Sequence, residues 1–137
     1  MRVLVDVCVI MEVVLKRKNF RGAGDFLKFL GNEKASGIIT TEVMTNLHYL
    51  LHRATHDEKR TREILREFVN FLYVVDTTSK DCLWALDSEI TDYEDGVMAE
   101  TAAREEVDAI VTYNVNDFKK CVIPIFTPEE FLKKYDK

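Results

Sequence analysis

Three carboxylates begin the run DYEDGVMAETA at residues 92–102, which has the pattern of a helix. Acidic side chains are favourable at a helix N-terminus, because the backbone N–H groups there are unpaired and the helix dipole is positive. Capping alone would explain them. On a 3.6-residue period, however, Asp92 and Asp95 share a face with apolar side chains, those of Met98, Ala99 and Ala102. That face should turn toward the interior, where a carboxylate needs a cation.

Two other segments also place polar side chains beside buried strands. The run RVLVDVCVI at 2–10 is almost entirely apolar and rich in valine, which predicts a strand buried on both faces with Asp6 inside it or at its end. A lone carboxylate in such a strand is costly unless something pairs with it. A second buried strand, predicted at 108–113, runs out into NVNDF and places three polar residues at its carboxyl end: Thr112, Asn114 and Asp117.

The elements that position these residues alternate between strand and helix patterns. Short strands are predicted at 2–10, 37–40, 73–76, 108–113 and 122–126. Helices are predicted at 20–30, 41–54, 57–72, 78–87, from 92 onward, and at 127–135. Thr78 or Ser79 is a candidate helix cap, and Thr127 with Glu130 has the spacing of a capping box. The alternation predicts one domain over 1–137, a three-layer α/β/α sandwich around a mostly parallel sheet.

In open parallel sheets, ligands bind at the carboxyl ends of the strands. Asp6, the 92–95 acids and Asp117 are all aimed at that edge, and several carboxylates converge only if a cation neutralises them or some are protonated. Oxygen ligands without His or Cys favour Mg²⁺ or Mn²⁺. Taken singly, Asp92 is equally explained as a helix cap and Asp117 as a turn residue. Neither explanation accounts for Asp6.

Composition narrows the class of protein without naming a function. The chain has 137 residues, 47% of them apolar, and a net charge of −5, which argues against a nucleic-acid partner. Basic stretches at 16–21 and 59–66 soften that objection, although nearby glutamates also explain the second as a solvated helix face. Three dispersed cysteines predict neither a zinc knuckle nor disulfides and suit the cytoplasm. We expect no signal peptide and no membrane span.

Two further patterns have a plain structural reading beside a functional one. His48, His52 and His56 are spaced four apart and could form a transition-metal face, but we expect the first two to face solvent and the third to leave the helix. Trp84 and its neighbours Leu83 and Leu86 are interpreted as core and not as a base-stacking platform.

The motifs together resemble the PIN-domain proteins, the fold of metal-dependent ribonucleases that includes VapC-type toxins. The resemblance runs nearly end to end. It is carried by VLVDVCVIMEVVLKR, where the family has a strand, an aspartate and a short helix, by TTEVMTNLHYLLHR, by DYEDGVMAETAAREEVDAIVTYNVNDF, and by IPIFTPEEFL. The DYED run points to one branch of the family. The resemblance implies Mg²⁺- or Mn²⁺-dependent cleavage of RNA, a cognate antitoxin as inhibitor, and a homodimer.

The family's four acids are only partly present. Asp6 matches the first acid and Asp95 the third. The second acid, a glutamate in the family, falls on Asn46, with Glu42 one turn earlier. The fourth falls on Asn114, with Asp117 one turn further on. The small hydroxyl residue and asparagine that often follow the first acid are replaced by Val7 and Cys8.

The resemblance also implies roles. Asp6 and Asp95 would hold one ion, while Asp117 or Asp92 would hold a second ion or orient a water. Thr112 and Asn114 would hold the phosphate or a water in the outer shell of the ion. Asn46 and Asn114 favour an alternative, a PIN-like module that binds RNA or a protein without cutting. A second alternative is a receiver-like domain whose acidic Mg²⁺ pocket accepts a phosphoryl group; the chain lacks the lysine expected after a late strand of such a domain.

Overall fold

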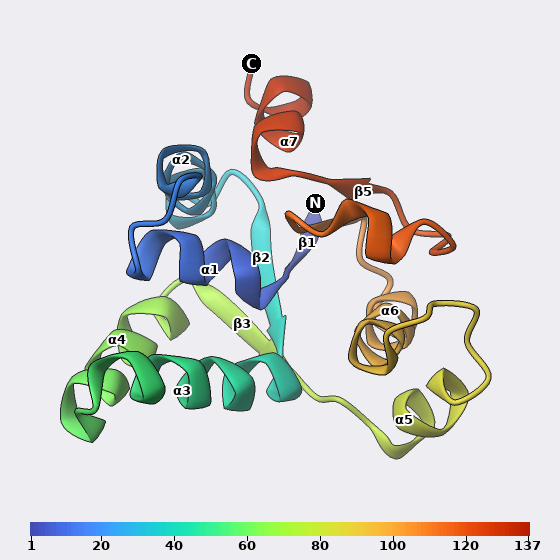
Figure 1. The fold of residues 1–137 in the computed structure, drawn as a ribbon. Coiled ribbons are helices and arrows are strands. Elements are labelled where there is room, and N and C mark those ends of the chain that lie inside the picture. Colours follow the sequence, from blue (N-terminus) through green and yellow to red (C-terminus); the bar gives the residue numbers. More distant parts are fainter.

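Five parallel strands form one sheet at the centre of the protein (Figure 1). The computed structural model describes all 137 residues. The strands are β1 (Arg2–Val5), β2 (Ser36–Thr40), β3 (Leu72–Val75), β4 (Ala109–Val111) and β5 (Ile125–Phe126). Their order is β3-β2-β1-β4-β5, and every neighbouring pair is parallel, so all five carboxyl ends point to one edge. β1 lies in the middle because its valines and leucine are buried on both faces.

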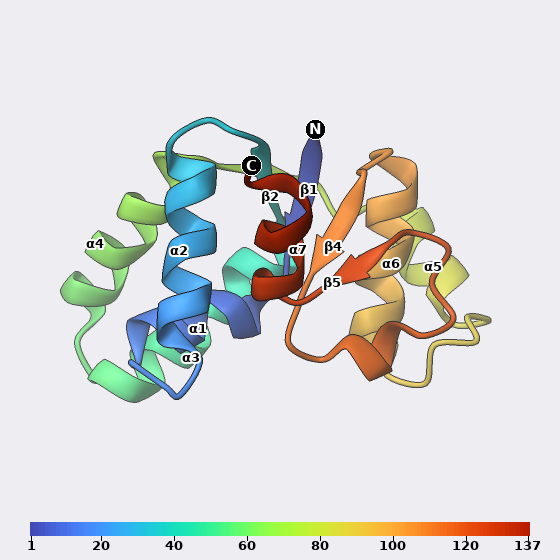
Figure 2. The same ribbon diagram turned by 90° about the horizontal axis from the view of Figure 1, so that it is seen from above.

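Helices cover both faces of the sheet. They are α1 (Val7–Val14), α2 (Phe20–Gly31), α3 (Thr41–Thr55), α4 (Glu58–Val69), α5 (Ser79–Ala85), α6 (Tyr93–Arg104), α7 (Pro128–Tyr135) and the short 3₁₀ helix η1 (Val115–Phe118). Figures 1 and 2 show α1 to α4 gathered on one side and α5 with α6 on the other, while α7 lies near α2. This arrangement confirms the predicted three-layer fold. None of the helices is both long enough and apolar enough to cross a bilayer.

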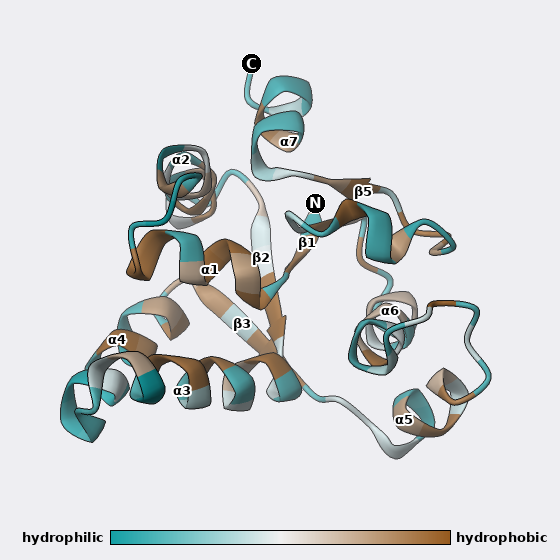
Figure 3. Ribbon diagram, viewed as in Figure 1, coloured by the Kyte–Doolittle hydropathy of each residue, from teal (hydrophilic) through white to brown (hydrophobic).

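The apolar side chains of the strands and of the inward helix faces make one core of 31 buried residues. Figure 3 shows this as brown ribbon along α1 and the central strands, with teal on the outer turns of α7 and α4.

The order of the strands in the sheet decides between the PIN-like fold and the receiver-like fold, the two folds that the sequence left open. Receiver-like domains have the order 2-1-3-4-5, whereas here β1 lies between β2 and β4. The receiver-like alternative was therefore wrong.

The first predicted strand was too long. The apolar run continues to Ile10, but the strand ends at Val5 and α1 begins at Val7. A short apolar run cannot be assigned to strand or helix by periodicity alone, and buried Val9, Ile10 and Met11 satisfy a helix packed against the core equally well. The family resemblance had implied this strand, aspartate and helix. Asp6 consequently sits at the carboxyl end of the central strand.

The helix ends follow the predicted capping chemistry. Thr78 caps α5 and Thr127 caps α7, each in a capping box with the residue three positions on, Asp81 and Glu130. Asp81 has a second role, because its buried carboxylate accepts hydrogen bonds from Arg104 Nε at 3.1 Å and Nη2 at 3.0 Å. This pair joins α5 to the far end of α6 and so fixes the helix that carries the central acids.

Trp84 was predicted in the core but lies on the surface. Its exposed fraction is 60%, and those of Leu83 and Leu86 are 61% and 67%. The reason is that α5 turns a different face, that of Ala85 and Asp81, toward α6. The apolar residues on its other side are left without a partner within the chain.

Candidate active site

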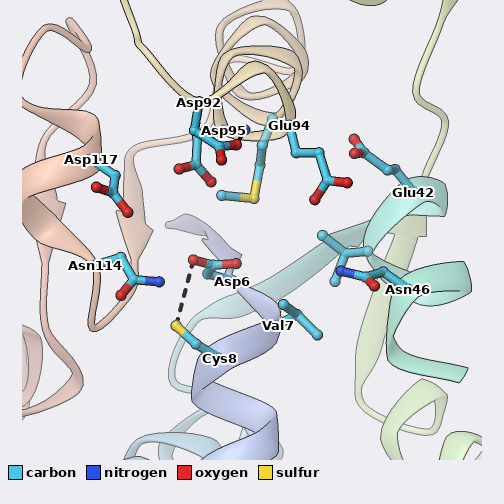
Figure 4. Close-up of a pocket in the computed structure, with 12 residues that line it drawn as sticks. Asp6, Val7, Cys8, Glu42, Asn46, Asp92, Glu94, Asp95, Asn114 and Asp117 are labelled. Atoms are coloured by element: carbon cyan, nitrogen blue, oxygen red, sulfur yellow. Dashed lines mark hydrogen bonds between the residues drawn. The ribbon is translucent and has the colours of Figure 1, made fainter. Parts of the chain in front are cut away.

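A cavity of about 220 Å³ opens at the carboxyl edge of the sheet (Figure 4). Twelve residues line it, and six of them are acids: Asp6, Glu42, Asp92, Glu94, Asp95 and Asp117. The acids come from four separate segments, the end of β1, the start of α3, the start of α6 and η1. Seven of the eight residues predicted for the site line this cavity, and Thr112 is the exception.

Asp6 occupies the floor of the cavity. Its backbone N–H donates to Val111 O at 3.0 Å, which extends the pairing of β1 with β4 by one residue and fixes where the side chain emerges. The carboxylate is only 7% exposed. It accepts a hydrogen bond from Thr112 Oγ1 at 2.7 Å, and the Cys8 thiol lies 3.5 Å away. Burial raises the pKa of Asp6 above its ordinary value, and these hydrogen bonds partly oppose that rise.

Thr112 therefore lies behind Asp6 and is fully buried. Its hydroxyl donates to Asp6 and accepts from the backbone N–H of Asn114 at 2.9 Å. Both hydrogen-bonding directions of the hydroxyl are thus engaged within the protein. This placement differs from the predicted contact with a phosphate and makes Thr112 a residue that positions Asp6.

The first turn of α6 supplies three of the acids. Asp92 is the helix cap, since its Oδ1 accepts from the Asp95 backbone N–H at 3.0 Å, and this confirms the capping interpretation of Asp92. Asp95 faces the cavity beside it. Burial raises the pKa of Asp95 to about 7, and the negative charges of Asp92, Asp6 and Asp117 add to that effect. The ionised form of Asp95 is thus electrostatically unfavourable in its inward position.

α3 contributes a separate pair of side chains on the opposite wall. Thr40 caps this helix by accepting from Val43 N at 3.0 Å, which places Glu42 in the first turn and Asn46 one turn later. Figure 4 shows the carboxylates of Glu42 and Glu94 turned toward each other above Asn46. Burial raises the pKa of Glu42, with further contributions from Glu94 and Asp92. Asn46, which aligns with the missing family acid, thus lies close to two acids, Glu42 and Glu94.

Glu94 was not among the predicted site residues. On a helical period it does not share the face of Asp92 and Asp95, so the face analysis passed over it. It reaches the cavity because the rim lies at the very start of α6, where side chains on adjacent faces all border the opening. The signal in the sequence that could have identified Glu94 was its place in the acidic run at residues 92–95.

The segment after β4 completes the cavity. Asn114 precedes η1 and Asp117 lies within it, and both line the opening opposite α3. Phe118 beneath them is fully buried and anchors this turn in the core. Cys8 lines the floor beside Asp6, and burial together with the Asp6 charge raises the pKa of its thiol to about 11. It is therefore an uncharged thiol at neutral pH.

No protein cation balances these acids. Neither Lys, Arg nor His lines the cavity, and none of the six acids belongs to an ion pair. Oxygen donors of this kind suit a hard divalent cation. As they stand, no three His, Cys, Asp or Glu side chains are close enough to hold a metal together. Mg²⁺, however, is commonly bound through one or two carboxylates and several waters, so the donor set fits such an ion.

The polar residues of α3 and α4 have structural partners instead. His48 bonds Glu58 at 2.7 Å, and Glu58 also accepts from Arg62 at 2.9 Å. Arg60 pairs with Glu63 at 3.5 Å. His56 is the residue that ends α3. A three-histidine metal face is therefore absent, and the basic stretch of α4 is partly balanced by its own glutamates.

The cavity lies at the carboxyl edge of a parallel sheet, which is where open α/β proteins bind their ligands. A family model for the PIN domain matches residues 2–116, so the chain belongs to the PIN domain family. No curated protein matched the chain.

Solved structures share the fold at low sequence identity. VapBC2 from Rickettsia felis bound to a promoter DNA fragment is 18% identical, with a TM-score of 0.70 over 92% of this chain and 97% of that one. A toxin–antitoxin complex from Klebsiella pneumoniae is 20% identical, with a TM-score of 0.69 over 93% and 98%. VapC20 from Mycobacterium tuberculosis, a toxin that cleaves the Sarcin-Ricin loop, is 12% identical, with a TM-score of 0.59 over 79% and 86%.

Proposed function

We propose that this chain is a Mg²⁺- or Mn²⁺-dependent endoribonuclease and the toxin of a toxin–antitoxin pair. The observation that carries the proposal is the convergence of six acids without a protein cation at the carboxyl edge of the sheet. A protein retains such repulsion when a ligand relieves it. Family membership favours a nuclease, and the similarity to a toxin–antitoxin complex and to a toxin that cleaves the Sarcin-Ricin loop favours RNA and an antitoxin partner.

The residues have distinct roles in this proposal. Asp6 and Asp95 would hold the ion together with several waters, and Asp117 would orient the attacking water or bind a second ion. A bound Mg²⁺ or Mn²⁺ would supply a polarised phosphate and a more acidic water. Thr112 keeps Asp6 in one orientation through its 2.7 Å hydrogen bond. Asn46 and Asn114 are uncharged, so their amide N–H groups can approach a phosphate oxygen without repelling it.

The acids on the second wall make up part of the charge that Asn46 lacks. Glu42 and Glu94 would attract a second cation or waters bound to the first. The alternative remains a PIN-like module that binds RNA or a protein without cutting it. The observation that favours this alternative is that asparagine stands at two of the four family acid positions, Asn46 and Asn114.

An assay for cleavage of labelled single-stranded RNA in Mn²⁺ or Mg²⁺ distinguishes the endoribonuclease from the non-cutting module. We expect cutting by the wild type that EDTA stops and that is lost in Asp6→Asn and Asp95→Asn. Asp25→Asn, an exposed acid on α2, is the matched control and should cut normally. If several RNAs remain intact with the wild type after any bound inhibitor has been stripped away, the non-cutting module becomes the better conclusion.

The partner proteins are proposed on separate grounds. The exposed Leu83 and Trp84 of α5, with Leu86 directly after it, offer apolar surface that a second copy of the chain could bury, which supports a homodimer. We expect light scattering to give a dimer mass for the wild type and a monomer mass for Trp84→Ser with unchanged folding. Co-expression with the product of an adjacent gene should relieve growth arrest if that product is the antitoxin.

A further inference from the structure

A second cavity, of about 410 Å³, adjoins the acidic one. It lies between the first turns of α3, the loop after β3, the middle of α5 and the first turns of α6, and we call it the α3–α6 pocket. Its lining includes Thr41, Thr45, Thr77, Tyr93 and Val97. Glu42 lines both cavities, so the two are contiguous across a single side chain. Whatever binds one cavity reaches the entrance of the other.

Hydrogen bonds within the protein engage two of the three threonine hydroxyls of the α3–α6 pocket. Thr41 Oγ1 accepts from the Thr77 backbone N–H at 3.0 Å, and Thr45 Oγ1 donates to Thr41 O at 3.0 Å. The hydroxyl oxygen of Thr77 is buried and has no hydrogen-bond partner in the protein. Buried polar atoms are nearly always paired, so the Thr77 hydroxyl is available to a ligand once rotation about χ1 turns it into the pocket. A hydroxyl both donates and accepts, which suits the edge of a nucleobase.

Tyr93 offers an aromatic surface at the same pocket. Its side chain is 45% exposed, yet its hydroxyl donates to Cys82 O at 2.8 Å. The hydrogen bond holds the ring in place, so little conformational entropy remains to be lost when a ligand stacks on it. Stacking of a base on an aromatic side chain contributes about 1–3 kcal/mol and tolerates any base.

We propose that the α3–α6 pocket binds an unpaired nucleobase of the RNA, next to the phosphate held in the acidic cavity. The proposal rests on the proposed function and adds the subsite that holds the substrate. The acidic cavity holds a phosphate only together with the metal ion of the proposed function. The Glu42 carboxylate at the boundary would repel a phosphate that no ion neutralises, so the group bound in the α3–α6 pocket is the uncharged base. Tyr93 would stack on the base, and Thr77 would hydrogen-bond its edge.

Binding of single nucleosides tests the pocket without any cleavage. Adenosine, guanosine, cytidine and uridine are titrated in EDTA and followed by saturation-transfer NMR. We expect at least one nucleoside to bind the wild type at millimolar concentration and to bind Tyr93→Ala roughly 5- to 150-fold more weakly. Tyr93→Phe should retain binding because the ring remains. Thr77→Val should weaken it, and Thr77→Ser, which restores the hydroxyl, should recover it.

Tyr73→Ala provides the matched control, since Tyr73 is 65% exposed on the edge strand and lies outside the α3–α6 pocket. In RNA cleavage, the pocket variants should raise KM and leave kcat near the wild-type value. Nucleoside binding that is lost in the pocket variants supports the subsite even if no RNA is cut, and in that case only the proposed function fails. No nucleoside binding to the wild type, or equal binding to wild type, Thr77→Val and Tyr93→Ala, would overturn the proposal.

Discussion

Replacing Asp95 by asparagine should stabilise the folded protein at neutral and alkaline pH while it removes a proposed metal ligand. The Asp95 carboxylate is held near Asp92, Asp6 and Asp117, and its pKa rises from 3.8 to about 7. Between these values the folded state holds a proton that the unfolded state has released. Stability of the wild type therefore falls as the pH rises from about 4 to about 7 and stays reduced above that range.

The size of the effect follows from that pKa. A rise from 3.8 to about 7 corresponds to about 4 kcal/mol for the charged form. Asp95 is only partly buried, so solvent screening reduces this to about 2 kcal/mol. Asparagine also loses the favourable interaction of an acid with the α6 N-terminus, which is about 0.3–1 kcal/mol. We expect Asp95→Asn to be more stable by about 1–2 kcal/mol at pH 8, or about 4–8 °C in Tm, and equal to the wild type at pH 4.

Urea unfolding at pH 4, 6 and 8 without metal measures the difference, with Asp25→Asn as a control that should stay within about 0.5 kcal/mol. Adding Mn²⁺ at pH 8 should stabilise the wild type and leave Asp95→Asn unchanged, because only binding to the folded state shifts the equilibrium. The reasoning is refuted if Asp95→Asn is the less stable protein at pH 8, or if its difference from the wild type is the same at pH 4.

Three further predictions concern the groups around the cavity. Thr112→Val removes the hydroxyl that positions Asp6, so we expect a loss of about 1–2 kcal/mol in stability and weaker Mn²⁺ binding, both restored by Thr112→Ser; unchanged calorimetric affinity would show that the hydroxyl has no positioning role. Asp81→Ala removes the buried partner of Arg104 and leaves it only the carboxylate of Glu105, so it should cost about 2 kcal/mol in urea unfolding; a loss below about 1 kcal/mol would contradict the role of this pair in fixing α6. Asn46→Glu adds an acid to the cavity wall and should tighten Mn²⁺ binding roughly tenfold, or about 1.4 kcal/mol; titration calorimetry showing equal or weaker binding would place Asn46 outside the metal's reach.

The local features of this protein were readable from its sequence. Strand and helix alternation, the caps at Thr78 and Thr127, and the anomalous acid Asp6 depend on side chains within a few positions of one another. Because parallel strands direct their carboxyl ends to one edge, even the approximate meeting place of Asp6, Asp95 and Asp117 could be predicted before any coordinates. The length of the first strand was predicted wrongly because a short apolar run is compatible with a strand and with a buried helix.

Relations between distant segments required the tertiary structure. Thr112 lies behind Asp6 across 106 positions of sequence, and whether its hydroxyl faces the cavity or the core depends on the register of β4 against β1. The close approach of the Glu42 and Glu94 carboxylates depends on how the starts of α3 and α6 are placed across the sheet edge. Trp84 is exposed because α5 packs against α6 through the face of Asp81 and Ala85. Sequence specifies each side chain's chemistry, whereas packing between elements decides which of these side chains meet.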